Sequence, residues 1–188
     1  NEANAHPHAT ERVAVVHNGI IENFTEIRTE LVELGHVLTS ETDTEVLVHL
    51  IDRYLQDGLS PQIATGAALK RLQGAFALGI IFTGETKLMI GARRGSPLAI
   101  GIGDGEMFLG SDAIALAPLT KSIIYLEDGD WVVLTDTNYT IYNETDHEVA
   151  REVRQTVLTG AAIGKGGYRH FMLKEIYEQP QVIGDTLH

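Results

Sequence analysis

Apolar and polar positions in the first third of the chain predict one strand followed by three helices. Residues 12–17 form a short apolar run that reaches Asn18-Gly19, so we expect a buried strand that ends there in a sharp turn. Apolar residues then recur at intervals of three and four positions, which is typical of amphipathic helices. We expect these helices between Asn23 and Gly35, between Ser40 and Gly58, and from Ser60-Pro61 to Leu72.

The middle of the chain consists of short apolar runs separated by turn residues, which predicts strands. Residues 83–86, 95–97 and 103–105 have the composition of hairpin turns. The runs are too close together for helical crossovers, so we expect antiparallel pairing and an α+β fold. The predicted strands cover residues 74–82, 87–93, 98–102, 107–109, 122–126, 131–135 and 139–142.

The last part of the chain, from Glu144 to His188, is more polar and reads as a linker. It contains a glycine-rich hinge at residues 164–167, followed by a helix-like stretch, residues 174–180, that we expect Pro180 to interrupt. The sequence therefore predicts one domain over residues 1–165 and a junction over residues 166–188.

Composition and charge exclude several classes of protein. The 188 residues carry 14 Lys and Arg against 26 Asp and Glu, a net charge of −12, which argues against a nucleic-acid partner. No apolar run approaches the roughly 20 residues that span a bilayer, and no targeting signal is recognisable, so we expect no membrane partner and a cytoplasmic location. The chain contains no cysteine, which excludes disulfides, cysteine-bound metals and a thiol nucleophile within these residues.

Two clusters of ionisable residues each have a chemical and a structural interpretation. His6, His8 and His17 offer imidazoles to a metal ion, but without a partner at ligand spacing we expect pocket histidines and no metal. Residues 41–45 hold three carboxylates that would suit calcium or an amine, although acidic residues also stabilise the first turn of a helix. The local sequence favours the helix interpretation. It leaves open whether Glu41 and Glu45 contribute to an amine site.

Three other motifs have simple structural interpretations. Arg93-Arg94 would suit an anion, but a solvated turn explains it equally well. Ser111-Asp112 is better explained as a helix cap than as a catalytic pair. The glycines of residues 101–105 precede a strand and not a helix, so a hairpin turn is favoured over a dinucleotide-binding loop.

Asn18-Gly19 is the strongest candidate for chemistry. A side-chain amide beside a backbone N–H, after a buried strand, supplies two converging donors for a developing oxyanion. The same dipeptide is also a common hairpin turn, so its neighbours must decide between the two interpretations.

Four stretches together resemble the glutaminase domain of class II glutamine amidotransferases, namely residues 4–8, 16–23, 40–46 and 95–98. Residues 168–180 are similar to the junction between glutaminase and sugar isomerase domains in the members of that family that form glucosamine 6-phosphate. The resemblance covers nearly the whole chain. It implies an N-terminal nucleophile hydrolase fold, an αββα sandwich of two antiparallel sheets between helical layers.

The resemblance also implies a reaction and assigns residues to it. In this family an N-terminal cysteine hydrolyses L-glutamine to L-glutamate, and the ammonia converts fructose 6-phosphate to glucosamine 6-phosphate in the isomerase domain. By matching motif, the Asn18 side chain and the Gly19 N–H form the oxyanion hole, Asp43 pairs with the α-ammonium group of glutamine, and His6 supports the pocket. The resemblance implies no cofactor and no metal. The sugar isomerase domain of the same parent chain and a homodimer of the parent enzyme are the partners that the resemblance implies.

The chain departs from the family pattern in two respects. It has no cysteine, and it lacks the family's Thr-Arg-Trp-Ala-Thr-His-Gly motif, whose arginine binds the α-carboxylate of the substrate. We therefore expect that these residues alone do not hydrolyse glutamine and that the fold lacks its first strands. The alternatives are a non-catalytic amino-acid-binding domain, the glutaminase domain of another class II enzyme such as amidophosphoribosyltransferase, and an interaction domain that uses an exposed sheet edge.

Overall fold

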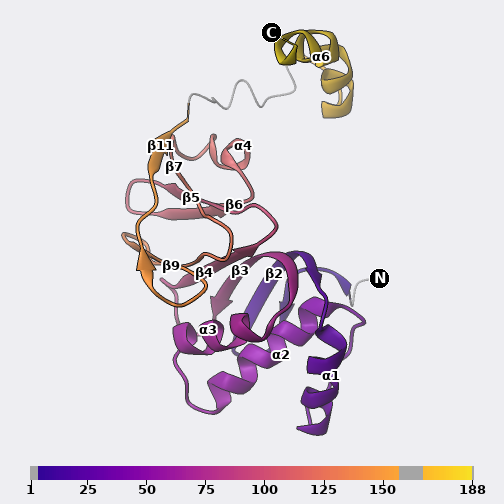
Figure 1. Cartoon of the computed structure of the whole chain (residues 1–188), viewed down its shortest axis with the longest axis vertical. Helices are drawn as coiled ribbons and strands as arrows, with labels where there is room; N and C mark the ends of the chain where they lie inside the picture. Colours follow the sequence, from indigo (N-terminus) through magenta and orange to yellow (C-terminus); the bar gives the residue numbers. More distant parts are fainter. Residues whose placement is uncertain (1–3, 157–166, 188) are drawn as a thin grey trace.

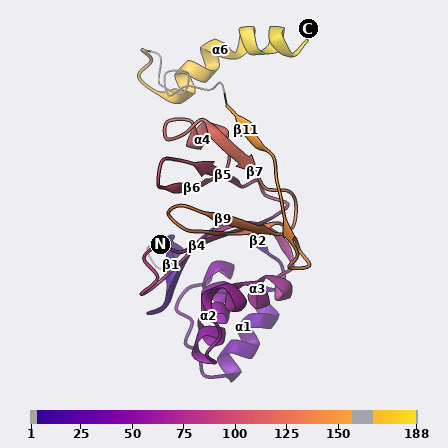
Figure 2. The same ribbon diagram turned by 90° about the vertical axis from the view of Figure 1, so that its left-hand side faces the viewer.

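Two antiparallel β-sheets are stacked face to face, with helices outside both of them (Figures 1 and 2). The structure is a computed structural model that describes residues 4–156 and 167–187. Helices α1 to α3 lie outside the larger sheet, and the short helix α4 lies beyond the smaller sheet (Figure 2). These layers confirm the predicted α+β sandwich. The helices are α1 (Phe24–Glu33), α2 (Asp43–Gln56), α3 (Pro61–Arg71) and α4 (Ala113–Leu116).

The helices of the first layer begin where the sequence supplies capping residues. The Thr42 side chain accepts a hydrogen bond from the N–H of Glu45 at the start of α2. The Ser60 side chain accepts one from the N–H of Ile63, and Pro61 occupies the first position of α3. Such caps satisfy N–H groups that have no partner within the helix. The three predicted helices are therefore confirmed, with ends that differ by a few residues.

Within the described residues the larger sheet has seven strands in the order β1-β2-β3-β4-β8-β9-β10, and all of its pairings are antiparallel. The predicted strands of this sheet are confirmed, and the predicted turn at residues 83–86 joins β3 to β4 as a hairpin. The strands are β1 (His8–Ala9), β2 (Val13–Ile21), β3 (Gly74–Phe82), β4 (Met89–Arg94), β8 (Trp131–Leu134), β9 (Tyr139–Tyr142) and β10 (Glu148–Val149).

The smaller sheet has four strands in the described residues, in the order β11-β7-β5-β6. The predicted hairpin at residues 103–105 joins β5 to β6, but the predicted hairpin at residues 95–97 is wrong. That turn carries the chain from the larger sheet to the smaller one, because β4 pairs with β8 and not with β5. The strands are β5 (Ala99–Ile102), β6 (Met107–Gly110), β7 (Ser122–Tyr125) and β11 (Val153–Gln155).

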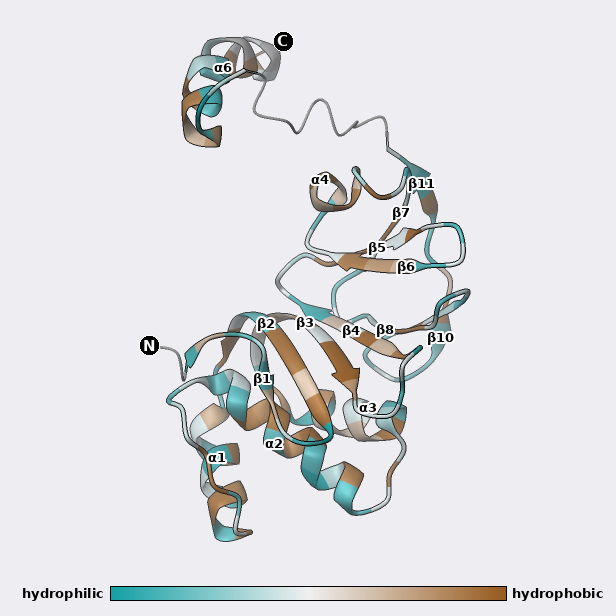
Figure 3. Cartoon of the chain, turned by 180° about the vertical axis from the view of Figure 1, so that it is seen from behind, coloured by the Kyte–Doolittle hydropathy of each residue, from teal (hydrophilic) through white to brown (hydrophobic). Residues whose placement is uncertain are grey.

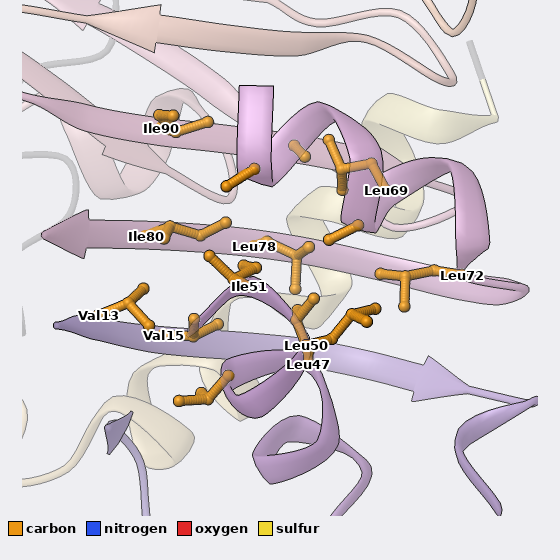
Figure 4. Close-up of a cluster of buried hydrophobic side chains, with 14 of the residues drawn as sticks. Val13, Val15, Leu47, Leu50, Ile51, Leu69, Leu72, Leu78, Ile80 and Ile90 are labelled. Atoms are coloured by element: carbon orange, nitrogen blue, oxygen red, sulfur yellow. The ribbon is translucent and has the colours of Figure 1, made fainter. Parts of the chain in front are cut away.

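The main hydrophobic core lies between the larger sheet and the helical layer. Alternate residues of β2 and β3 point toward the helices, where the inward faces of α2 and α3 meet them (Figure 4). Figure 3 shows the hydrophobic character of β2 and β3 beside these helices. Burial of this apolar surface is the largest favourable contribution to folding, at about 25 cal/mol per Å². The side chains labelled in Figure 4 are Val13, Val15, Leu47, Leu50, Ile51, Leu69, Leu72, Leu78, Ile80 and Ile90.

A glycine pair lets the two sheets approach each other closely. Gly79 of β3 and Gly91 of β4 are direct partners in the larger sheet. A Cβ atom on Gly91 would lie 2.8 Å from Leu109 of the smaller sheet, and one on Gly79 would lie 3.5 Å from the same side chain. The missing side chains therefore leave a hollow that Leu109 occupies.

The polar C-terminal part of the chain contains more structure than the sequence suggested. Within residues 144–156, β10 and β11 extend the two sheets, so this segment is not simply a linker. Helix α6 (Phe171–Thr186) continues through Pro180, which was expected to interrupt it, and lies apart from both sheets in Figures 1 and 2. The glycine-rich hinge lies mostly outside the described residues, so the domain boundary at residue 165 stays a prediction. Among the described helices, none has the length and apolar character needed to cross a membrane.

Candidate active site

Asp43 is fixed at the junction of β2 and α2. It is the first residue of α2, and its Oδ2 accepts a hydrogen bond of 2.7 Å from the backbone N–H of Ile21. The positive end of the helix dipole and the first-turn N–H groups favour a negative charge at this position. The side chain is 21% exposed, which leaves the carboxylate accessible to a ligand. A buried strand and a helix N-terminus thus present one oriented carboxylate.

Three histidines contact the hydroxyl groups of Thr42 and Thr44, the residues on either side of Asp43. His6 Nε2 and His17 Nδ1 lie 3.2 Å and 2.9 Å from Thr44 Oγ1, and His8 Nε2 lies 3.0 Å from Thr42 Oγ1. Burial lowers the pKa of His17, and His6 acts in the same direction, while the Asp43 carboxylate opposes it. Burial, followed by His6, also lowers the pKa of His8.

These contacts suit histidines that line a polar pocket, and the lowered pKa values of His8 and His17 favour their neutral forms. Within the described part of the chain, no group of three or more His, Cys, Asp or Glu is arranged to hold a metal ion. The hypothesis that His6, His8 and His17 form a metal site therefore receives no support from the geometry.

Gly19 lies inside β2, which corrects the prediction of a turn at Asn18-Gly19. The strand continues to Ile21, with Gly19 opposite Phe76 of β3. Gly19 has a φ of 135°, and a Cβ atom there would lie 2.1 Å from the carbonyl oxygen of Ala75. Only glycine adopts this backbone conformation easily. The positive φ that is typical of a turn therefore occurs here inside a paired strand.

Asn18 faces the space between the two sheets. Its side chain is exposed and lines a cavity of about 230 Å³, together with Ala77, Pro97 and Leu109. Among the residues that the structure describes, none forms a hydrogen bond with the Asn18 amide. The amide is therefore available to a ligand in this cavity.

One strand connects the two candidate groups. Ile21, whose N–H binds Asp43, lies two positions after Gly19, which corresponds to about 6.6 Å along a strand. An extended glutamine spans about 5 Å from its α-nitrogen to its carboxamide carbon, from standard bond lengths. The spacing is thus suited to a ligand with an ammonium group at Asp43 and a carbonyl oxygen near Asn18-Gly19.

Glu45 has a structural role and does not join the amine site. Its carboxylate accepts hydrogen bonds from the N–H and hydroxyl groups of both Thr39 and Ser40, at 2.7 to 3.0 Å. Burial alone would raise the pKa of Glu45, but these hydrogen bonds lower it below its ordinary value. Glu41 is exposed. The Asp43 and Glu45 carboxylates accept hydrogen bonds from different groups and Glu41 is exposed, so the geometry does not support a calcium site.

The other polar motifs form hydrogen bonds that stabilise the fold. Arg93 and Arg94 donate to the carbonyl oxygens of Leu126 and Leu72, which explains the arginine pair without a bound anion. Asp112 caps α4 by accepting a hydrogen bond of 2.9 Å from the N–H of Ala115, as the sequence predicted.

One residue of the site and one contact were not predicted from the sequence. Thr44 was not singled out, and His17 was expected as a pocket histidine without a named partner. The alternation of β2 places His17 on the helix-facing side, which was a usable signal, but its contact with Thr44 depends on how α2 packs against the strand.

The two stacked antiparallel sheets, with Asn18-Gly19 on β2 and Asp43 beside that strand, define a fold of the N-terminal nucleophile hydrolase type. The chain belongs to the family of the glutamine amidotransferase domain, whose model matches residues 2–118. This membership confirms the class that the sequence motifs indicated.

Curated relatives of high identity share one name. The chain is 61% identical over 184 residues to a glutamine–fructose-6-phosphate aminotransferase (isomerizing) of Bradyrhizobium diazoefficiens, covering 98% of this chain and 30% of the relative. A protein of the same name from Mesorhizobium japonicum is 58% identical, covering 100% of this chain and 31% of the relative. The chain therefore spans about 30% of the length of these relatives.

Solved structures share the fold. A glutamine phosphoribosylpyrophosphate amidotransferase from B. subtilis, complexed with ADP and GMP, superposes with a TM-score of 0.59 and 27% identity, covering 70% of this chain and 29% of that chain. A glutamine aminotransferase class-II domain protein from Silicibacter pomeroyi has a TM-score of 0.53 and 16% identity, covering 76% of this chain and 71% of that chain, and shows the fold alone.

Proposed function

We propose that this chain is the glutamine-binding and glutamine-hydrolysing part of a glutamine–fructose-6-phosphate aminotransferase. The observation that carries the proposal is the Asp43 carboxylate, held by the Ile21 N–H two residues beyond Asn18-Gly19 on the same strand. Identities near 60% to relatives of that name favour this enzyme over an amidophosphoribosyltransferase, for which the structural match has 27% identity.

In the proposed reaction Asp43 binds the α-ammonium group of L-glutamine, which selects an amino acid over a simple amide. The carboxamide then lies near Asn18 and Gly19, whose side-chain amide and backbone N–H stabilise the oxyanion of the tetrahedral intermediate. His6 supports the pocket through Thr44.

The nucleophile is a thiol from outside these 188 residues, which contain no cysteine. Its sulfur attacks the carboxamide carbon, ammonia leaves with the thiol proton, and water hydrolyses the thioester to L-glutamate. We propose that the 188 residues alone bind the amino acid but do not turn it over, and that the ammonia reaches fructose 6-phosphate in a sugar isomerase domain of the same parent chain. A homodimer of that parent enzyme is part of the proposal.

The test is a kinetic comparison with the complete gene product. Asp43→Asn removes the charge that pairs with the substrate ammonium, so we expect the KM for glutamine in glutamate release to rise about tenfold to a hundredfold. Asp112→Asn is the matched control, because it changes a carboxylate that only caps α4. Formation of glucosamine 6-phosphate from fructose 6-phosphate, measured in the same sample, tests the ammonia acceptor.

Two results would refute the proposed function. One is a folded complete gene product that releases no glutamate from glutamine. The other is an Asp43→Asn variant whose KM equals that of Asp112→Asn.

A further inference from the structure

His17 lies next to Asp43 with its ring almost completely buried. Its side chain is 2% exposed, and its Nδ1 lies 2.9 Å from Thr44 Oγ1 and 3.7 Å from Asp43 Oδ1. Its Nε2 is buried and has no hydrogen-bond partner among the residues that the structure describes. The proposed reaction does not use His17, so these contacts require another explanation.

The surroundings of the ring select one tautomer. With the proton on Nδ1, His17 donates to the Thr44 hydroxyl, and the positive end of the N–H faces the Asp43 carboxylate. With the proton on Nε2, a buried N–H would have no acceptor, and the Nδ1 lone pair would face the carboxylate at 3.7 Å. The first arrangement has the lower free energy because it leaves no buried donor without a partner.

The same tautomer sets the direction of the Thr44 hydroxyl. If Thr44 Oγ1 accepts from His17, its own proton is free to point toward Asp43 Oδ1, 3.5 Å away. His6 Nε2 lies 3.2 Å from the Thr44 hydroxyl oxygen and would be a second donor to it in the Nε2–H tautomer. Both carboxylate oxygens of Asp43 then face donors, Oδ2 the Ile21 N–H and Oδ1 the Thr44 hydroxyl.

We propose that His17 is a positioning residue for the amino-acid site, and that its Nδ1–H orients the Thr44 hydroxyl and through it the Asp43 carboxylate that receives the substrate ammonium. This inference rests on the proposed function. His17 touches neither the reacting carbonyl nor the nucleophile in the proposed reaction. It acts on binding, so its loss should raise KM more than it lowers kcat.

The first test compares three substitutions in the complete gene product. His17→Leu removes the donor, and we expect the KM for glutamine to rise about threefold to tenfold, from the net value of one hydrogen bond. His17→Asn keeps a donor at the position of Nδ1 and should restore the KM to near the wild-type value. Thr44→Val should raise the KM as His17→Leu does, and the double variant should be no worse than the poorer single variant, because both act on one network.

His147→Leu is the control, because His147 is an exposed histidine remote in sequence from this network. A His17→Leu variant with the KM of His17→Asn, or effects of His17→Leu and Thr44→Val that add fully, would overturn the inference.

A second measurement does not depend on the variants folding or on turnover. A long-range ¹H–¹⁵N spectrum of the unmodified 188-residue chain reports which ring nitrogen of His17 carries the proton at neutral pH. We expect the Nδ1–H form, and an Nε2–H form would overturn the inference. If the wild-type gene product forms no glutamate, the proposed function fails, whereas the spectrum still decides whether His17 donates to Thr44.

Discussion

Replacing Gly19 with alanine tests whether the close approach of β2 and β3 depends on a missing side chain. The new Cβ atom would lie 2.1 Å from the Ala75 carbonyl oxygen and 2.8 Å from Cα of Phe76, which are both backbone atoms. No side chain can rotate away, so the strands must separate by about 1.3 Å to reach the 3.4 Å of ordinary contacts. We expect this separation to break the strand ladder around Gly19.

The cost follows from two contributions. A φ of 135° costs a residue with a Cβ atom about 1–3 kcal/mol, and two weakened ladder hydrogen bonds cost about 1 kcal/mol each. The expected loss in the free energy of unfolding is therefore about 3–5 kcal/mol. Gly58→Ala is the matched control, because Gly58 has a φ of 87° but no atom within 4 Å of its added Cβ. That variant should lose only about 1–2 kcal/mol.

Urea unfolding followed by tryptophan fluorescence measures both losses. Trp131 is the single tryptophan of the chain and is 7% exposed, so its emission should change strongly on unfolding. With a slope of about 2 kcal/mol per molar urea, the midpoint should fall by about 1.5–2.5 M in Gly19→Ala and by less than about 1 M in Gly58→Ala. Equal midpoints for the two variants would refute the argument from the strand contact.

Two further predictions concern the segment that carries Asp43. Thr42→Ala removes the cap of α2 and should lower the free energy of unfolding by about 1–2 kcal/mol in the same urea assay. Thr42→Ser keeps a hydroxyl group and should lose less than half of this free energy. Equal losses in the two variants would contradict a capping role. Glu45 has a lowered pKa in the folded state, so its stabilising effect is present above its unfolded pKa near 4.5 and is lost as the pH falls through the folded value. Glu45→Gln should therefore be less stable at pH 7 and lose less stability than wild type on acidification below pH 4.5, and parallel pH profiles for the two proteins would contradict this.

Local patterns were sufficient to predict most elements but not their long-range pairing. The strand at residues 74–82 and the helix that begins near Asp43 follow from apolar spacing and caps, which neighbouring residues determine. The end of β2 was misplaced because the partner that keeps Gly19 in the sheet, Phe76, is remote in sequence. The turn at residues 95–97 was misread for the same reason, because β8 takes the place beside β4 that a hairpin partner would have.

The candidate site was predictable only as a set of separate motifs. Local chemistry marked Asn18-Gly19 and the carboxylates around Asp43 as candidates, but their roles came from the resemblance to a family. No local pattern shows that the Ile21 N–H binds Asp43. Thr44 looks like an ordinary helix residue in the sequence. Its importance depends on His17, which only the packing of α2 on β2 brings within hydrogen-bond distance.

The glycine pair in the larger sheet has a consequence for which molecules can enter beside Asn18. Leu109, which occupies the hollow at Gly79 and Gly91, also lines the cavity that Asn18 faces. A methyl group at Gly91 would meet Leu109 at 2.8 Å and displace it, either into the cavity or outward with its whole sheet. The first change would narrow the cavity and the second would widen it. Gly91, which does not line the cavity, thus fixes the position of a side chain that does.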